Sequence, residues 1–294
     1  MKKGVWYAVG AYILWGFFPI YWKWLQQVPA LQLLGHRIIW SFLFLFFIEL
    51  WLRQGRVFRA AISSPRILLI YSTAAILLAI NWLTYVWAVN AGFIVETSLG
   101  YFINPLLSMV LGVVILRERL RLWQWVPVGL AAIGVIYLTV AYGSLPWIGL
   151  ILAFSFGLYG FIKKTAPLGS LHGVTLETGI LFLPALLFLL YTEATGAGAF
   201  LHSGMISNLL MVGAGVITSV PLLMFASASQ RIPLSLVGVL QYIAPTMYFL
   251  IGVLLYDEPL TPERLIGFGI IWIALAIFAI EGFIHHQAQV AIVE

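Results

Sequence analysis

The chain has 294 residues, of which 63% are hydrophobic and only 9% are charged, and its formal net charge is +5. Soluble domains carry roughly 25% charged residues, and a water-soluble fold this apolar would expose large hydrophobic patches. The composition therefore excludes a soluble protein. The basic residues are scattered over short loops, which does not indicate nucleic-acid binding, and the lack of cysteine excludes disulfide and thiolate chemistry.

Ten long apolar segments follow one another along the chain. Each is close to the ~20 residues that a membrane-spanning helix needs, and none shows the alternation of a transmembrane strand. The first continues to about Leu25 without a signal-peptide cleavage site, so we expect it to remain as a span. The sequence predicts an all-α membrane protein with ten transmembrane helices. Their approximate limits are residues 4–25, 31–52, 67–89, 94–116, 122–141, 146–163, 172–191, 207–229, 234–255 and 264–283.

The distribution of Lys and Arg predicts the orientation of these spans. With the N-terminus in the cytoplasm, twelve basic residues fall on the cytoplasmic side, two (Lys23 and Arg264) fall outside, and Arg37 alone lies within a span. Cytoplasmic loops of membrane proteins are enriched in Lys and Arg. We therefore expect a multi-pass membrane protein with both termini in the cytoplasm and residues 286–294 as a cytoplasmic tail.

The sequence matches itself at an offset of 140 residues. "YFINPLLSMVLGVVILRERL" (101–120) falls on "QYIAPTMYFLIGVLLYDEPL" (241–260) without a gap, so that Pro105 meets Pro245 and Glu118 meets Glu258. Each unit holds five spans, an odd number, so the second unit must be inverted in the membrane relative to the first. Inverted repeats of this kind build many secondary transporters, with the solute site at the repeat interface. We predict two five-helix repeats, residues 1–142 and 143–285.

Five segments together resemble the EamA-type branch of the drug/metabolite transporter superfamily, in particular its RarD-like permeases. They are "AYILWGFFPIYWK", "HRIIWSF", "NWLTYVWAVN", "ETSLGYFINPLLSMVLGVVILRERL" and "LQYIAPTMYFLIGVLLYDEPL", and the resemblance covers almost the whole chain. It implies ten spans arranged as five plus five in the bacterial inner membrane. It also implies export or exchange of small organic metabolites, drugs or amino acids, without fixing the substrate. We expect no cofactor and no metal.

Arg37 is the residue that the membrane tolerates least. A mid-span Arg costs about 2.5–3.5 kcal/mol on insertion scales, and this one lies ~9 Å below the outer end of the second span. Snorkelling to the outer headgroups would relieve that cost, but the neighbouring His36 and Trp40 favour the wall of a polar cavity. We therefore predict that His36, Arg37 and Trp40 bind substrate.

Glu177 is the equivalent of Arg37 at the offset of 140 residues. Inversion puts equivalent residues at mirrored depths, so we expect the two to mark opposite ends of one pathway and not to form an ion pair. A carboxylate inside the membrane can take up a proton. Glu177 or His36 is therefore a candidate for proton coupling. The alternative for Glu177 is a structural hydrogen bond to a neighbouring helix.

Polar and aromatic side chains of other spans complete the predicted site. Asn81 and Tyr85 are four residues apart and share a helix face. Pro105 and Pro245 each free a backbone carbonyl one turn earlier, and such breaks at matching positions of two halves indicate a transporter site. Gating or packing without solute contact is the alternative. The predicted substrate-binding residues in these spans are Trp15, Asn81, Tyr85, Tyr101, Asn104, Tyr159, Gln241 and Tyr242.

Residues at span ends are expected to face the lipid headgroups. Lys23 and Lys163 are predicted to anchor there, and Trp22 is predicted to belong to the interfacial aromatic belt. These positions are therefore left out of the predicted site.

Other functional classes fit the sequence less well. An intramembrane aspartyl protease needs two Asp, and the chain has one, Asp257; it also lacks H-E-x-x-H, G-x-S-x-G and P-loop motifs. The sequence contains no selectivity-filter motif of the kind that would indicate a channel.

We predict a secondary transporter, a permease or exporter, that moves small amphipathic organic solutes by alternating access and is not an enzyme. Its partners are the solute and membrane lipids, with protons as a hypothesis, and either a monomer or a homodimer is consistent with the sequence. A flippase for lipids or lipid-linked head groups that uses the same cavity is the alternative.

Overall fold

The computed structural model describes residues 2–53, 55–91, 93–256 and 261–293, and all regular structure within these ranges is helical. The prediction of an all-helical membrane protein is confirmed. Asp257 and Glu258 lie outside the described residues. Nine helical segments within those ranges are long and apolar enough to cross a membrane: Lys2–Lys23, Ala30–Trp51, Pro65–Ala88, Thr97–Ile115, Leu122–Ala141, Trp147–Thr165, Ser170–Ala194, Met205–Arg231 and Leu234–Leu255.

These nine segments coincide with the first nine predicted spans to within a few residues. A tenth apolar segment, Leu265–Glu281, is shorter, and ten spans therefore stay a prediction. This segment belongs to the last helix, which continues to Val293. Most of the predicted tail is thus an extension of that helix.

The helices follow one another with short connections. The first half of the chain holds α1 (Lys2–Gly16), α2 (Phe18–Lys23), α3 (Ala30–Trp51), α4 (Gly55–Ile62), α5 (Pro65–Asn90), α6 (Ile94–Val110), the π-helix η1 (Leu111–Ile115), the 3-10 helix η2 (Leu122–Gln124) and α7 (Trp125–Tyr142). The second half holds α8 (Trp147–Thr165), α9 (Ser170–Ala194), α10 (Met205–Arg231), α11 (Leu234–Gln241), α12 (Ile243–Leu255) and α13 (Pro262–Val293).

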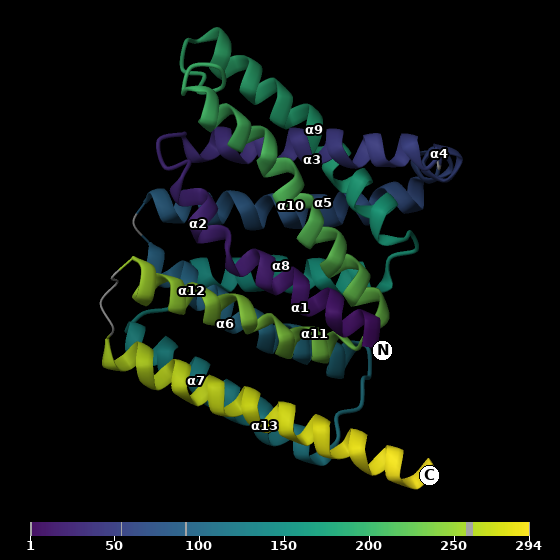
Figure 1. Ribbon diagram of the computed structural model, residues 1–294, viewed down its shortest axis with the longest axis vertical. Helices are drawn as coiled ribbons and strands as arrows, with labels where there is room; N and C mark the ends of the chain where they lie inside the picture. Colours follow the sequence, from purple (N-terminus) through teal and green to yellow (C-terminus); the bar gives the residue numbers. More distant parts are fainter. Residues whose placement is uncertain (1, 54, 92, 257–260, 294) are drawn as a thin grey trace.

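The long helices run side by side, and α1 begins at the same end of the molecule at which α13 ends (Figure 1). One edge is formed by α7 packed against α13, and the other edge by α3 packed against α9 and α10. The centre consists of α1, α6, α8 and α11, in which α6 contacts both α8 and α11. The centre therefore combines helices from both halves of the chain.

Small residues bring the central helices close together. A Cβ atom on Gly100 of α6 would lie 2.9 Å from the carbonyl oxygen of Gly149 in α8, and one on Gly238 of α11 would lie 2.6 Å from the carbonyl oxygen of Pro105. Membrane helices associate through such close packing because lipid tails provide no hydrophobic drive between them. Both crossings fix α6 in the middle of the molecule.

Two spans are each divided into two helices. The first is interrupted at Phe17, and Pro19 stands in the first turn of α2. The ninth is interrupted at Tyr242, between α11 and α12, where the freed carbonyl of Gln241 was predicted. Pro105, in contrast, lies inside the continuous helix α6. The break at Phe17 lets α2 take a direction that differs from that of α1 (Figure 1).

Glu118 joins the two halves of the chain at the start of α11. Its carboxylate accepts hydrogen bonds from the backbone N–H groups of Leu234 (2.6 Å) and Ser235 (2.9 Å) and from the Ser235 hydroxyl (2.7 Å). The N-cap residue of α11, Pro233, offers no side-chain acceptor. Glu118 therefore satisfies the exposed N–H groups at the start of α11 from a distant loop.

Substitution of Glu118 tests this cap. We expect Glu118→Ala to lower the free energy of unfolding by about 1–2 kcal/mol because two backbone donors lose their acceptor. The exposed Glu193, paired only with His202, supplies a matched control, and Glu193→Ala should change stability by less than about 0.5 kcal/mol. Thermal unfolding in detergent measures both variants. Equal effects of the two substitutions would contradict the capping role.

Candidate functional site

A cavity of about 770 Å³ lies between the helices of both halves. Its lining reaches Ala141, Tyr256 and Thr261, which adjoin the connections where α7 and α12 end and α13 begins. Ala141 and Glu263 of the lining are exposed, so the cavity opens beside these connections. The connections lie at the end of the molecule opposite to the start of α1 (Figure 1). Ligand sites commonly measure about 300–1,000 Å³, so the space suits a small organic molecule.

Arg37 lies in the wall of this cavity and is surrounded by aromatic rings. Its guanidinium carbon is 4.7 Å from the ring centroid of Trp82, 4.8 Å from that of Trp22 and 5.8 Å from that of Phe18. Its Nε donates a hydrogen bond to the hydroxyl oxygen of Thr218 at 3.1 Å. Cation–π contacts stabilise a guanidinium by about 0.5–2 kcal/mol each. These contacts offset part of the cost of burial while the charge is retained.

No carboxylate within the described ranges pairs with Arg37. The ion pairs found there are Arg121–Glu281, Lys163–Glu177, His172–Glu49 and His202–Glu193. A guanidinium has five N–H donors, and Thr218 takes up only the one on Nε. Arg37 therefore adds an uncompensated positive charge, with donors to spare, to the cavity wall.

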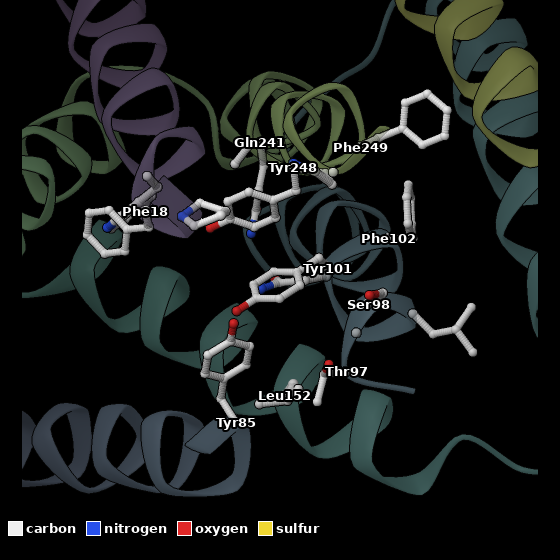
Figure 2. Close-up of a pocket in the computed structure, with 18 of the residues that line it drawn as sticks. Phe18, Tyr85, Thr97, Ser98, Tyr101, Phe102, Leu152, Gln241, Tyr248 and Phe249 are labelled. Atoms are coloured by element: carbon white, nitrogen blue, oxygen red, sulfur yellow. The ribbon is translucent and has the colours of Figure 1, made fainter. Parts of the chain in front are cut away.

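Three tyrosines form a polar wall close to Arg37. Tyr85, Tyr101 and Tyr248 come from α5, α6 and α12, and each interacts electrostatically with the guanidinium. The ring centroids of Tyr85 and Tyr101 are 6.0 Å apart, and those of Tyr101 and Tyr248 are 5.6 Å apart. The hydroxyl groups of Tyr85 and Tyr101 point toward one another (Figure 2). This wall offers hydroxyl donors beside the charge.

Two buried polar atoms of the lining have no partner within the described part of the protein. They are the hydroxyl oxygen of Tyr12 and Oε1 of Gln241. Most buried polar atoms in proteins are hydrogen-bonded. Both atoms are exceptions to this rule, and neighbouring groups enclose them in this conformation.

Aromatic rings close the cavity toward the start of α1. Trp15 and Phe156 belong to the lining, and the ring centroid of Phe225 is 5.7 Å and 5.2 Å from theirs. On its other side Phe225 stacks on Tyr159, with a centroid distance of 6.0 Å and an interplanar angle of 14°. These rings pack against one another between the cavity and the start of α1.

An ion pair lies directly beyond the rings. Lys163 Nζ is 2.7 Å from Oε1 of Glu177, and the Tyr159 hydroxyl donates to Oε2 at 3.0 Å. The side chains of Lys163 and Glu177 are 1% and 0% exposed. We call Phe225, Tyr159, Lys163 and Glu177 the sealing layer.

The prediction that Lys163 anchors at the headgroups is wrong. Helix α9 covers the end of α8, and Gly173 lets it approach so closely that an added Cβ atom would lie 3.0 Å from Lys163 Nζ. Arg37 and Glu177, as expected, do not pair with each other.

Seven of the predicted site residues line the cavity. Asn81 does so while its amide bridges α5 to α8, donating to the Leu152 carbonyl (2.9 Å) and the Ser155 hydroxyl (3.0 Å). Asn81 therefore both holds α5 against α8 and forms part of the cavity wall. The seven are Trp15, Arg37, Asn81, Tyr85, Tyr101, Asn104 and Gln241.

The other four predicted residues point elsewhere. His36 and Trp40 are four residues apart and share one stripe of α3, which faces Phe200 at ring distances of 5.0 Å and 6.2 Å. Arg37 lies about 100° round the helix from His36. Tyr242 is buried and donates to a backbone carbonyl at 3.3 Å, and Tyr159 belongs to the sealing layer.

Among the aromatic lining residues that the sequence analysis missed, four interact with Arg37. Trp22 was predicted to lie at the interface, but the break before α2 turns it toward Arg37. Pro19 is the signal that could have revealed this turn. Trp82 follows Asn81 directly, and no pattern marked it out. The four are Phe18, Trp22, Trp82 and Tyr248.

Comparison with known proteins identifies the family. Residues 2–140 match the EamA-like transporter family. Over 282 residues the chain is 48% identical to the uncharacterized transporter YojE of Bacillus subtilis, covering 94% of this chain and 93% of the relative. The chain belongs to the EamA-like transporter family. The protein RarD of Streptomyces exfoliatus is 44% identical over 94% of this chain and 88% of its own, and RarD of Escherichia coli is 40% identical over 95% of each.

The fold has a solved counterpart. A crystal structure superimposes with a TM-score of 0.69 at 18% identity and covers 93% of this chain and 96% of that chain. At this identity the likeness supports the fold alone. The resemblance to EamA-type, RarD-like proteins is confirmed, and this family member is a multi-pass integral protein of the bacterial inner membrane. Family membership points to a transporter and away from an enzyme.

The sealing layer of this EamA-family protein allows a stability test. Glu177→Gln should lower the free energy of unfolding by about 3–5 kcal/mol because it leaves the Lys163 ammonium buried without a counter-charge. Adding Lys163→Met should restore most of that loss, since the introduced glutamine can still accept from Tyr159. Thermal unfolding in detergent compares the single and double variants. A single variant as stable as the wild type would show that Lys163 has another way to be neutralised or hydrated.

Proposed function

We propose that this protein is a secondary transporter that moves small amphipathic organic solutes across the inner membrane by alternating access. The observation that carries the proposal is the cavity of about 770 Å³, which opens at one end and is closed at the other by the sealing layer. A pore would be open at both ends, and a purely structural protein would fill such a space.

The chemistry of the wall supports amphipathic solutes. Aromatic rings such as Trp15 and Phe18 provide apolar surface, while Arg37, Asn81 and Gln241 add polar groups. Ligand sites combine mostly apolar walls with a few placed polar groups that fix the orientation of the ligand. A solute with one polar and one apolar part satisfies both kinds of wall.

We further propose that residues 1–142 and 143–285 are inverted five-helix repeats, with the tenth span in α13. Helix order at the offset of 140 residues supports this division: α3 begins at Ala30 and α9 at Ser170, and α5 begins at Pro65 and α10 at Met205. The match to the family ends at residue 140. The helix contacts also support this division. Helix α1 contacts α10 and α11 in the same way that its repeat equivalent α8 contacts α5 and α6.

Two related halves with opposite orientation offer two conformations of similar energy. In the conformation described here Arg37 lies in the open half of the pathway, while its repeat equivalent Glu177 lies in the sealing layer. The second conformation would part Phe225 from Trp15 and Phe156 and would close α2 and α12 over the present opening. With both termini in the cytoplasm, as the basic residues predict, the present opening faces outward.

Glu177 is the better candidate for proton coupling within this proposal. Protonation would weaken its ion pair with Lys163 and so favour opening of the sealing layer. His36 faces Phe200 and not the cavity. Transport by a Glu177→Gln variant that keeps full dependence on the pH gradient would remove Glu177 from this role.

A ligand screen tests the proposed substrate class. Purified protein would be melted in the presence of a library of small metabolites and drugs, because a ligand that binds the folded state stabilises it by about 2.7 kcal/mol at 100 times its Kd. We expect stabilisation by small amphipathic compounds, followed by counterflow of the same compounds in proteoliposomes. Stabilisation by phospholipid or polyprenyl species alone would contradict the proposal and favour a flippase.

Blocking the cavity gives a more specific prediction. Ala141 lines the cavity, whereas its neighbour Val140 is 72% exposed on the outside of α7. We expect Ala141→Trp to reduce counterflow of the solute found in the screen about tenfold or more, since overpacking of the site costs ~1–3 kcal/mol. Val140→Trp adds the same bulk outside the cavity and should keep near wild-type counterflow. Equal rates in both variants would show that solutes do not pass through this cavity.

A further inference from the structure

We propose that the substrates are small organic carboxylates with an apolar or aromatic body, and that Arg37 recognises the carboxylate. This inference rests on the proposed function, because it names the chemistry of the solute that occupies the same cavity. Charge, hydrogen-bonding capacity and the shape of the surrounding wall each support it.

The charge of the wall favours an anion. Among the lining residues that the structure describes, Arg37 and Glu263 carry formal charge. Glu263 is exposed in the first turn of α13, beside the opening. Arg37 has no carboxylate partner in those residues, and attraction between unlike charges is much stronger in an apolar cavity than in water. An anion neutralises Arg37, whereas an organic cation would meet its repulsion.

The free donors of Arg37 suit a carboxylate in particular. Nε is occupied by Thr218, and the two terminal nitrogens have no acceptor in the described part of the chain. A guanidinium presents such a pair of N–H groups as a fork that matches the two oxygens of a carboxylate. The faces of Trp22 and Trp82 contact the cation without accepting these hydrogen bonds as a carboxylate would.

The neighbouring walls complete the recognition. The hydroxyl groups of Tyr85 and Tyr101 point toward one another (Figure 2). Both tyrosines interact electrostatically with the guanidinium, and their hydroxyl groups can donate to the remaining lone pairs of the carboxylate. Phe18 and Phe249 lie on other sides of the same space and provide apolar contact (Figure 2). A molecule with a carboxylate at one end and an aromatic body at the other therefore matches the cavity.

Matched sets of probes test the inference on the purified full-length protein. One set is 3-phenylpropanoate, 3-phenylpropanamide and 3-phenylpropylamine, which share a body and differ in the charge of the end group. A second set has an indole body and a third an octyl chain. We expect a carboxylate to raise the melting temperature and to bind at least about tenfold more tightly than its amide, and the amines to give no stabilisation.

Variants assign the preference to Arg37. Arg37→Gln should weaken carboxylate binding about ten- to hundredfold and bring it level with the amide. Arg37→Lys keeps the charge but loses the fork and should give an intermediate affinity. The control is Arg66→Gln, which removes an exposed arginine at the start of α5 and should leave the preference unchanged.

Several results would overturn the inference. They are a lack of stabilisation by every carboxylate, equal or tighter binding of amides or amines, and a carboxylate preference that survives Arg37→Gln. Stabilisation by anionic phospholipid vesicles alone would overturn it as well. If Arg37→Gln fails to fold, the probe sets on the wild type and on Arg37→Lys still test whether Arg37 recognises the carboxylate.

Counterflow of the bound probe in proteoliposomes separates this inference from the proposed function. Carboxylates that bind but never exchange would contradict transport while leaving the anion site in place. Exchange of amines in their stead would contradict the anion site while leaving transport in place.

Discussion

Charge inside a membrane must be paired or kept in contact with water, and two cations of this protein meet that constraint in different ways. Lys163 is paired with Glu177 and buried among α8, α9 and Tyr71 of α5. Arg37 has aromatic neighbours and one hydroxyl acceptor, and its remaining donors face a cavity. The closed end of the molecule thus contains the compensated charge, and the open end contains the uncompensated one.

This distribution links packing to function. A compensated pair can be surrounded by Phe225 and Tyr159 because it needs no water. An uncompensated guanidinium prevents the same dense packing around itself, and the space that results is available to a solute. In the proposed cycle the open end closes and the closed end opens. Solute bound at Arg37 and a proton bound at its repeat equivalent Glu177 would therefore each shift the equilibrium between the two conformations.

Much of the fold could be predicted from the sequence because the membrane imposes a one-dimensional signal. Span length and hydrophobicity located nine helices to within a few residues. The cost of a buried charge placed Arg37 at a polar cavity. The side of a helix that faces the cavity depends on how the helices pack, however, and the sequence alone did not predict it. His36 and Trp40 adjoin Arg37 in the chain but face Phe200, since neighbours in a helix point in different directions.

Lys163 shows the same limit at a span end. Its position predicted contact with headgroups, and only the close approach of Gly173 in α9 reveals that it is enclosed. Trp22 turned inward because of a helix break whose direction the sequence does not encode locally. Such errors concern the relative placement of helices and not their existence.

Labelling of single cysteines from each side of the membrane tests the central claim that the cavity opens to one face and is sealed from the other. The chain contains no cysteine, so Ser98→Cys in the cavity lining and Thr165→Cys at the exposed end of α8 report without background. An impermeant thiol reagent should reach Ser98→Cys from the outer face alone and Thr165→Cys from the inner face alone. Reaction of both positions from the same face, or of Ser98→Cys equally from both faces, would contradict the account.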